Sequence, residues 1–247
     1  MTRGRRQGIV AAIAIVIAIA SIAIVVINRR LTHDVNAALY IPKKARITPE
    51  IVLLQQYVRI DTSNPPGNEL PGARFLAALI EEAGVKAEII ESAPRRANVY
   101  ARIKGKKSGD GLILHNHIDV VPADPKEWEV PPFSGAIRLN MVYGRGSVDM
   151  KSIALCELEG FLGVARSGRQ PERDIIFLAT ADEEEGSALG IRWLLDHRPD
   201  IFDGVKYAIT EGGVTEMQKE TVTYYGIEIG SKQRVELDLV ANDEATL

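Results

Sequence analysis

Apolar residues recur in short runs along the middle of the chain. Runs of this length without alternation are typical of strands buried on both faces of a parallel sheet. Three such runs are Leu112–Leu114, Ile175–Leu178 and Tyr207–Thr210. Helices are expected between them, at 150–166 and 187–197, where apolar residues have helical spacing. Strands alternating with helices predict an α/β fold, in which a mixed, mostly parallel sheet has helices on both faces.

The residues before these strands predict two more helices and two more strands. A capping hydroxyl followed by proline at the first helical position indicates that a helix begins at Thr48. A second helix is expected from Glu69 to Ala83, where glycine follows. The stretches 85–90 and 99–103 are expected to be strands.

The N-terminal region differs from the rest of the chain. Residues Ile9–Ile27 contain only isoleucine, valine and alanine apart from Ser21. A helix of about 19 residues at 1.5 Å each is roughly 28 Å long, close to the hydrocarbon thickness of a bilayer. We expect a single-pass membrane anchor at 1–30, with a juxtamembrane linker at 31–47 and the folded domain outside the cytoplasm. A cleaved signal peptide is the alternative.

Composition restricts the function classes. Hydrophobic residues make up 46% of the chain and charged residues 26%, with a formal net charge of −3. This balance, without a basic stripe, gives no reason to expect nucleic-acid binding. The one cysteine, Cys156, is expected to be a small core side chain rather than a nucleophile, because no histidine lies near it in sequence.

Metal-binding types of residue follow the three apolar runs. Because the carboxyl ends of parallel strands meet at one edge of a sheet, these side chains should converge in one crevice. A turn that enters a helix lies between the first two runs and offers one more carboxylate. The converging residues are His117, Asp119, Asp149, Glu183, Glu184 and Glu211. We therefore expect a metal site at this edge.

The spacing suggests a role for each residue. His117 would supply a neutral ring nitrogen, and Asp119 would fix its tautomer through the other nitrogen. Asp149, between a glycine-containing turn and a helix, could bridge two cations. Adjacent Glu183 and Glu184 cannot easily face the same metal, so we assign Glu184 to the metal and Glu183 to proton transfer.

Glu211 would complete the coordination of the cation held by His117. Oxygen and nitrogen ligands without thiolate favour two zinc ions, with Co²⁺ or Mn²⁺ as alternatives. The other histidine of the first run, His115, should point away from the crevice. Taken singly, each of these residues has a simpler interpretation, such as a helix cap or a solvated loop charge.

Four motifs occur in order along the chain: His117-Ile-Asp-Val-Val-Pro122, Gly144-Arg-Gly146 with Asp149-Met-Lys151, Asp182-Glu-Glu184 with Gly186, and Glu211-Gly-Gly213. Together they resemble the M20 metallopeptidase family, which includes carboxypeptidase G2, aminoacylase-1, succinyl-diaminopimelate desuccinylase and carboxypeptidase S. The loop 61–69 and the segment 128–133 also resemble that family. The resemblance implies a zinc-peptidase-like catalytic domain at 48–230.

The resemblance also implies the chemistry. His117, Asp149, Glu184 and Glu211 match the family's metal ligands, and Glu183 matches its general acid/base. Substrates would be small peptides or N-acyl amino acids, cleaved at an amide bond without a covalent intermediate. The tethered form is most similar to the carboxypeptidase S branch.

The family's remaining histidine and its lid domain have no counterpart here. No histidine follows Glu211, and a lid strand is expected to begin within 231–247. We therefore expect the first half of an enzyme, which would form a homodimer only in full-length form. The alternatives are a membrane-anchored, non-catalytic binding module of the same fold, and a transferase or deacylase that acts on larger acyl groups.

Overall fold

The computed structural model describes residues 47–212, 215–218, 221–227 and 229. Within its larger unit, five strands form one sheet in the order β1-β2-β6-β3-β7. The strands are β1 (Ala87–Ala93), β2 (Arg96–Ile103), β3 (Gly111–His117), β6 (Ile175–Thr180) and β7 (Val205–Ile209). β3 pairs in parallel with both β6 and β7, whereas β2 is antiparallel to both its neighbours. Four of the five strands therefore share one direction, and the predicted mixed, mostly parallel sheet is confirmed.

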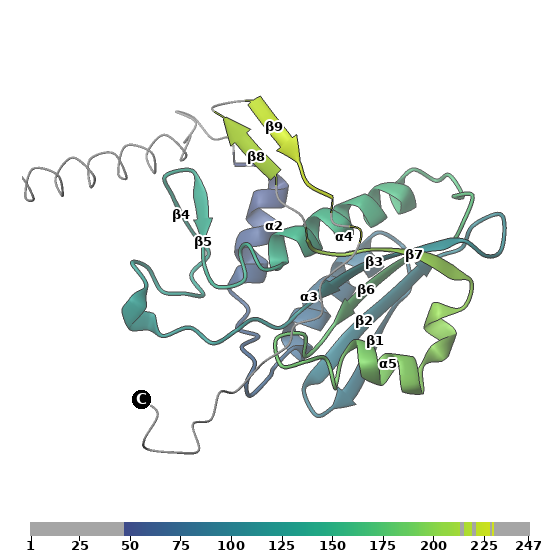
Figure 1. Ribbon diagram of the computed structural model, residues 1–247, viewed down its shortest axis with the longest axis horizontal. Helices are drawn as coiled ribbons and strands as arrows, with labels where there is room; N and C mark the ends of the chain where they lie inside the picture. The colour runs from purple at the N-terminus through teal and green to yellow at the C-terminus, as the bar shows by residue number, and fades with distance from the viewer. Residues whose placement is uncertain (1–46, 213–214, 219–220, 228, 230–247) are drawn as a thin grey trace, which may run out of the picture. The chain divides into compact units, whose positions relative to one another are not determined.

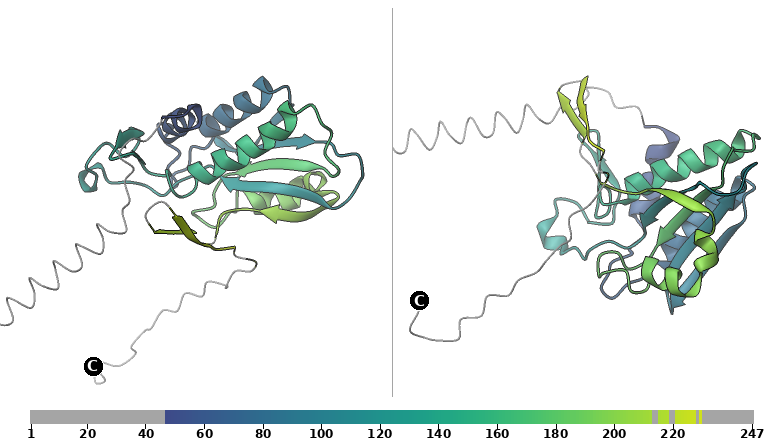
Figure 2. Two further views of the ribbon diagram at one scale, coloured as in Figure 1. Left: turned by 90° about the horizontal axis from the view of Figure 1, so that it is seen from above. Right: turned by 45° about the vertical axis from the view of Figure 1, so that its right-hand side comes forward.

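Helices cover both faces of this sheet, as predicted (Figures 1 and 2). The helices of the larger unit are α2 (Pro49–Val58), α3 (Leu70–Glu82), α4 (Lys151–Arg166) and α5 (Ile191–His197), with 3₁₀ turns η1 (Pro125–Glu127) and η2 (Pro199–Phe202). One core cluster joins α3 and α4 to β2 and β6, with Leu76, Leu158 and Phe177 fully buried. A second cluster lies on the opposite face, where Leu194 and Ile201 pack against the sheet.

Two short antiparallel pairs of strands lie outside the five-stranded sheet. One joins β4 (Ala136–Arg138) to β5 (Met141–Tyr143) within the larger unit. The other joins β8 (Thr215–Gln218) to β9 (Thr221–Tyr225), which belong to a separate unit. The expected lid strand, 232–241, lies outside the described residues.

Two burial predictions were wrong. The run 207–210 was expected to lie in a buried strand, but β7 is an edge strand of the described sheet, and Tyr207 and Ile209 are about half exposed. Cys156 was expected in the core, yet it is exposed on α4. Helical geometry explains this, because the buried stripe of α4 passes through Leu155 and Leu158 and leaves position 156 at its margin.

The predicted localisation must also be corrected. Among the residues that the structure describes, no helix is both long and apolar enough to cross a membrane. The segment that was expected to form the anchor, 1–30, lies outside the described residues. The prediction of a single-pass protein with an extracytoplasmic domain is therefore withdrawn.

Candidate metal centre

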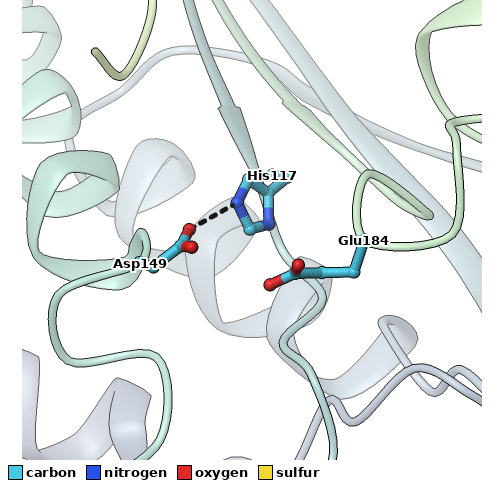
Figure 3. A group of neighbouring side chains, drawn as sticks. All are labelled: His117, Asp149 and Glu184. Carbon is cyan, nitrogen blue, oxygen red and sulfur yellow. Dashed lines mark hydrogen bonds and ion pairs between the residues drawn. The ribbon is translucent and has the colours of Figure 1, made fainter. Parts of the chain in front are cut away.

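The parallel arrangement of β3, β6 and β7 brings the predicted ligands together at one edge of the sheet. His117 is the last residue of β3, Glu183 and Glu184 follow β6, and Glu211 follows β7. Asp149 reaches the same place from the turn before α4. Figure 3 shows His117, Asp149 and Glu184 facing one another across this edge. The rule that ligands collect beyond the carboxyl ends of strands is followed here.

His117 lies at the centre of the cluster and is only 1% exposed. Its Nε2 atom lies 3.0 Å from Oδ1 of Asp149, 3.6 Å from Oε1 of Glu211 and 4.0 Å from Oε2 of Glu183. Two sets of side chains could each hold a metal ion, because the ligand atoms within each set lie within 4.8 Å of one another, and His117 belongs to both sets. The first set adds Asp149 and Glu184, and the second adds Glu183 and Glu211. These distances allow a cation to contact several of the side chains at once.

The turn before α4 presents Asp149 because it is tightly packed. Gly146 has a φ of +81°, and a Cβ atom there would lie 2.6 Å from Cγ1 of Val120. Neither the backbone conformation nor the space suits a larger residue. The Asp149 side chain is 64% exposed, so it can move to meet a ligand without breaking core contacts.

Asp119 contacts more than the histidine ring. Nδ1 of His117 lies 2.9 Å from the backbone carbonyl of Asp119 and 3.5 Å from its carboxylate. The carboxylate instead accepts hydrogen bonds from the backbone N–H of Glu183 at 3.1 Å and of Glu184 at 3.2 Å. Asp119 therefore connects the end of β3 to the loop that carries both glutamates.

Electrostatics mark the cluster as a site for a cation. Burial alone would lower the pKa of His117, but Asp119, Glu211 and Glu183 outweigh it and raise that pKa to about 9. Burial raises the pKa of Glu211, His117 opposes the rise, and the charge of Asp149 adds to it. Carboxylates crowded in this way repel one another, and a divalent cation would relieve that repulsion.

Glu184 behaves in the same way. Burial raises its pKa, the charge of His117 lowers it, and the charges of Asp149 and Glu183 raise it further. The residues therefore fit a metal by their chemistry: one imidazole nitrogen, several carboxylate oxygens, and an excess of negative charge.

His115 belongs to neither ligand set and contacts two threonines instead. Its Nε2 lies 3.1 Å from Oγ1 of Thr180, and its Nδ1 lies 3.4 Å from Oγ1 of Thr210. Burial, with a smaller effect of the charge on His117, lowers the pKa of His115 to about 4. His115 is therefore neutral at ordinary pH.

Residues 113–246 match the family described as "Peptidase family M20/M25/M40". The match covers more than half of the chain and includes every residue of the cluster. The chain belongs to this family.

A relative, succinyl-diaminopimelate desuccinylase from Bradyrhizobium sp. (strain ORS 278), is 34% identical over 167 residues, which are 64% of this chain and 42% of that protein. A probable succinyl-diaminopimelate desuccinylase from Staphylococcus aureus (strain Mu50 / ATCC 700699) is 33% identical over 140 residues, which are 55% of this chain and 33% of that protein. The chain thus spans about two fifths of the length of the first of these curated relatives and less of the second.

Solved M20 structures agree with the fold. The metallo-carboxypeptidase from Sulfolobus solfataricus aligns with a TM-score of 0.58 at 26% identity, over 67% of this chain and 38% of that one. Human carnosine dipeptidase 1 aligns with a TM-score of 0.56 at 20% identity, over 66% of this chain and 38% of that one. The M20 peptidase-like fold expected from the motifs is confirmed. The carboxypeptidase S branch that was predicted for this chain is not supported.

One residue that contacts the surroundings of the cluster was missed from the sequence. Asn64 was not assigned to the site, but it is 2% exposed, and its Nδ2 donates to Asp119 and to Asp182. The only signal was its place in the loop 61–69, which resembles the family's opening loop. Nothing in that loop shows that its amide meets two carboxylates from distant segments.

Proposed function

We propose that this chain forms the metal-binding part of a hydrolase that cleaves amide bonds in small peptides or N-acyl amino acids. The observation that carries the proposal is that two sets of possible metal ligands share His117, one with Asp149 and Glu184 and the other with Glu183 and Glu211. Relatives named as a desuccinylase and a metallo-carboxypeptidase support this reaction class. The proposed catalytic segment is 48–230.

His117, Asp149, Glu184 and Glu211 would hold two zinc ions, with Asp149 between them and with Co²⁺ or Mn²⁺ as alternatives. When bound, the cations would polarise the amide carbonyl and lower the pKa of water. Asp149 suits the bridging position because its exposed carboxylate has two oxygens, one of which lies 3.0 Å from Nε2 of His117.

Glu183 would accept the proton of the attacking water and return it to the departing nitrogen. Its side chain is 44% exposed, so a substrate can reach it, and its carboxylate lies 4.0 Å from His117. Its backbone is fixed at the same time by the hydrogen bond to Asp119. A mobile carboxylate on a fixed backbone suits a group that must accept and release a proton in one turnover.

Three neighbouring glutamates provide the test. Glu183→Gln, Glu184→Gln and Glu185→Gln remove one charge each from consecutive positions, and Glu185 is exposed and belongs to neither ligand set. Zinc titration by calorimetry should show weaker binding for Glu184→Gln alone. Hydrolysis of N-acetyl and N-succinyl amino acids by the full chain should be lost in Glu183→Gln and retained in Glu185→Gln.

Two results would contradict the proposal. If the wild-type chain binds no Zn²⁺, Co²⁺ or Mn²⁺, the cluster is not a metal centre. If it binds zinc tightly but hydrolyses none of these substrates, the binding module considered above becomes the better description.

A further inference from the structure

A chain of buried polar side chains runs from the metal cluster to the start of β2. It includes an arginine on β2 and a glutamate just before α3. Its members are Asp119, Asn64, Asp182, Arg96 and Glu69, and four of them, all except Arg96, are at most 5% exposed. Buried charges are costly unless they are paired and hydrogen-bonded, so a continuous network of this kind needs a reason.

Arg96 forms the outer end of the network. Its Nε and Nη2 atoms donate to the two carboxylate oxygens of Glu69 at 2.7 and 2.8 Å. Nη2 also donates to Oδ1 of Asp182 at 2.7 Å. The fork geometry of a guanidinium makes both contacts available at once, which a lysine could not do. Gly67 packs so closely on the guanidinium that a Cβ atom there would overlap it.

Asn64 forms the middle. Its single Nδ2 group donates to Oδ1 of Asp182 at 3.0 Å and to Oδ2 of Asp119 at 2.8 Å. An amide is well suited to this place because its two N–H bonds can serve two acidic neighbours. The carboxylate of Asp182 also accepts from the backbone N–H of Leu189 at 3.1 Å. The loop after β6 is thus held from both sides.

The inner end reaches the two glutamates assigned to proton transfer and metal binding. The Asp119 carboxylate accepts from the backbone N–H of Glu183 and of Glu184. If Asp182 moved, both the donor that Asn64 supplies to Asp119 and the start of the Glu183–Glu184 loop would move with it. The position of these glutamates therefore depends on contacts outside the cluster.

We propose that Arg96 is a positioning residue, which sets the places of Glu183 and Glu184 through Asp182, Asn64 and Asp119. This rests on the proposed function for its catalytic consequence. Arg96 touches none of the clustered ligands, so its removal leaves every ligand in the chain and changes only how they are held.

The chain offers a matched control on the same strand. Arg102 is also on β2, its side chain is 10% exposed against 12% for Arg96, and it pairs with Asp174 at 2.8 Å. Asp174 precedes β6, whereas Asp182 follows it. Arg96→Met and Arg102→Met therefore break similar ion pairs at opposite ends of one strand.

Backbone hydrogen exchange in the full chain tests the positioning directly and without metal. We expect the amides of Glu183 and Glu184 to exchange at least about tenfold faster in Arg96→Met than in the wild type, and to be nearly unchanged in Arg102→Met. Equal acceleration in both variants, or in neither, would overturn the proposal. Should Arg96→Met fail to fold, Glu69→Gln can replace it. This variant keeps the side-chain volume but weakens the paired hydrogen bonds from Arg96 to position 69, and we expect a smaller acceleration of exchange at the same two amides.

Turnover tests the catalytic consequence. With saturating Zn²⁺, Arg96→Met should lower kcat about 10- to 100-fold with little change in KM, Arg96→Lys should restore part of kcat, and Arg102→Met should leave both near wild type. Unchanged kcat in Arg96→Met, with wild-type activity present, would refute the positioning role. If the wild type itself neither binds Zn²⁺ nor hydrolyses substrate, the proposed function fails, and the exchange comparison still decides whether Arg96 fixes the loop.

Discussion

The ring of His117 is oriented by the backbone of Asp119 rather than by its carboxylate. Nδ1 lies 2.9 Å from the carbonyl oxygen and 3.5 Å from Oδ1. The carbonyl can only accept, so Nδ1 donates to it, and Nε2 faces Asp149 and Glu211, where a cation would bind once it displaces the proton on that nitrogen. The sequence analysis predicted that the Asp119 carboxylate orients the ring; the carbonyl lies nearer to Nδ1, while against the effect of burial the carboxylate raises the pKa of the ring.

Asp119→Asn should therefore separate metal binding from turnover. The carbonyl that orients His117 is retained, so the zinc affinity should stay within about tenfold of wild type. The new amide group turns a donor toward the N–H of Glu183 or Glu184, so kcat at saturating zinc should fall about 10- to 100-fold. Calorimetry and steady-state kinetics measure the two effects.

Asp174→Asn serves as the comparison, because it alters a partly buried carboxylate at the other end of β6. It should leave both quantities near wild type. A loss of zinc affinity above 100-fold with unchanged kcat in Asp119→Asn would show that the carboxylate, not the carbonyl, orients the ring.

Zinc affinity should rise with pH up to about 9. In the metal-free protein, burial opposes protonation of His117, but its acidic neighbours raise the pKa to about 9, so at neutral pH a cation must displace a proton from the ring. Each displaced proton makes the affinity about tenfold stronger per pH unit below that pKa. Calorimetry in buffers of different ionisation enthalpy should detect release of about one proton or more at pH 7.

His115→Gln should keep the same slope, because the pKa of His115 is lowered to about 4 and the ring is already neutral over this range. An affinity that does not change between pH 6 and pH 8 would mean that His117 is not a ligand.

The sequence predicted the cluster because one geometric rule places it. Parallel strands end at the same edge, so residues that follow β3, β6 and β7 had to meet wherever those strands were adjacent. The same rule could not predict that Asn64 joins them, since its amide lies 118 positions before Asp182 and belongs to a loop. The prediction that β7 is buried was wrong for a related reason. A run of apolar residues predicts a strand but does not show whether other strands flank it on both sides.

The Arg96 network was invisible in the sequence for a physical reason as well. Arg96 lies three positions before the expected strand 99–103, where an arginine is ordinarily solvated. Its partner Glu69 opened a predicted helix, where an acidic residue is favoured anyway. Only the packing of α3 against β2 reveals that the two side chains are buried together.

Glu157→Gln should stabilise the metal-free protein more at high pH than at low pH. Burial, against a hydrogen bond from Asn116, raises the pKa of Glu157 to about 7, and its Oε1 has no hydrogen-bond partner. The stability that its protonated form contributes is present below about pH 4.5 and is lost as the pH rises through 7. Glutamine does not ionise, so the variant should gain about 2–3 kcal/mol relative to wild type between pH 4.5 and pH 8.

Chemical denaturation in the presence of a chelator measures this difference. Glu159→Gln, two positions along α4, provides the control, because that side chain is 30% exposed and paired with Arg166. A relative stability of Glu157→Gln that is flat between pH 4.5 and pH 8 would show that Glu157 stays ionised in the fold.

Lys151→Met should destabilise the protein at high pH and much less at neutral pH. The amine of Lys151 is fully buried and donates to the backbone carbonyls of Tyr57 at 3.2 Å and Ile60 at 2.7 Å, which ties α4 to the end of α2. Burial lowers its pKa to about 7, with a small opposing effect of Asp61, so the folded state prefers the neutral amine, and wild-type stability falls as the pH drops from 10.5 toward 7. Methionine has no such pH dependence and leaves two carbonyls without their donor. The variant should therefore be less stable than wild type by about 2 kcal/mol near pH 9.5 and closer to wild type at pH 7.

Thermal unfolding at both pH values measures this difference. Lys104→Met provides the exposed comparison, and its stability should differ little from wild type at either pH. A loss of stability in Lys151→Met that is largest at neutral pH would mean that the buried amine is charged there and that its charge, rather than its two hydrogen bonds, holds α4 against α2.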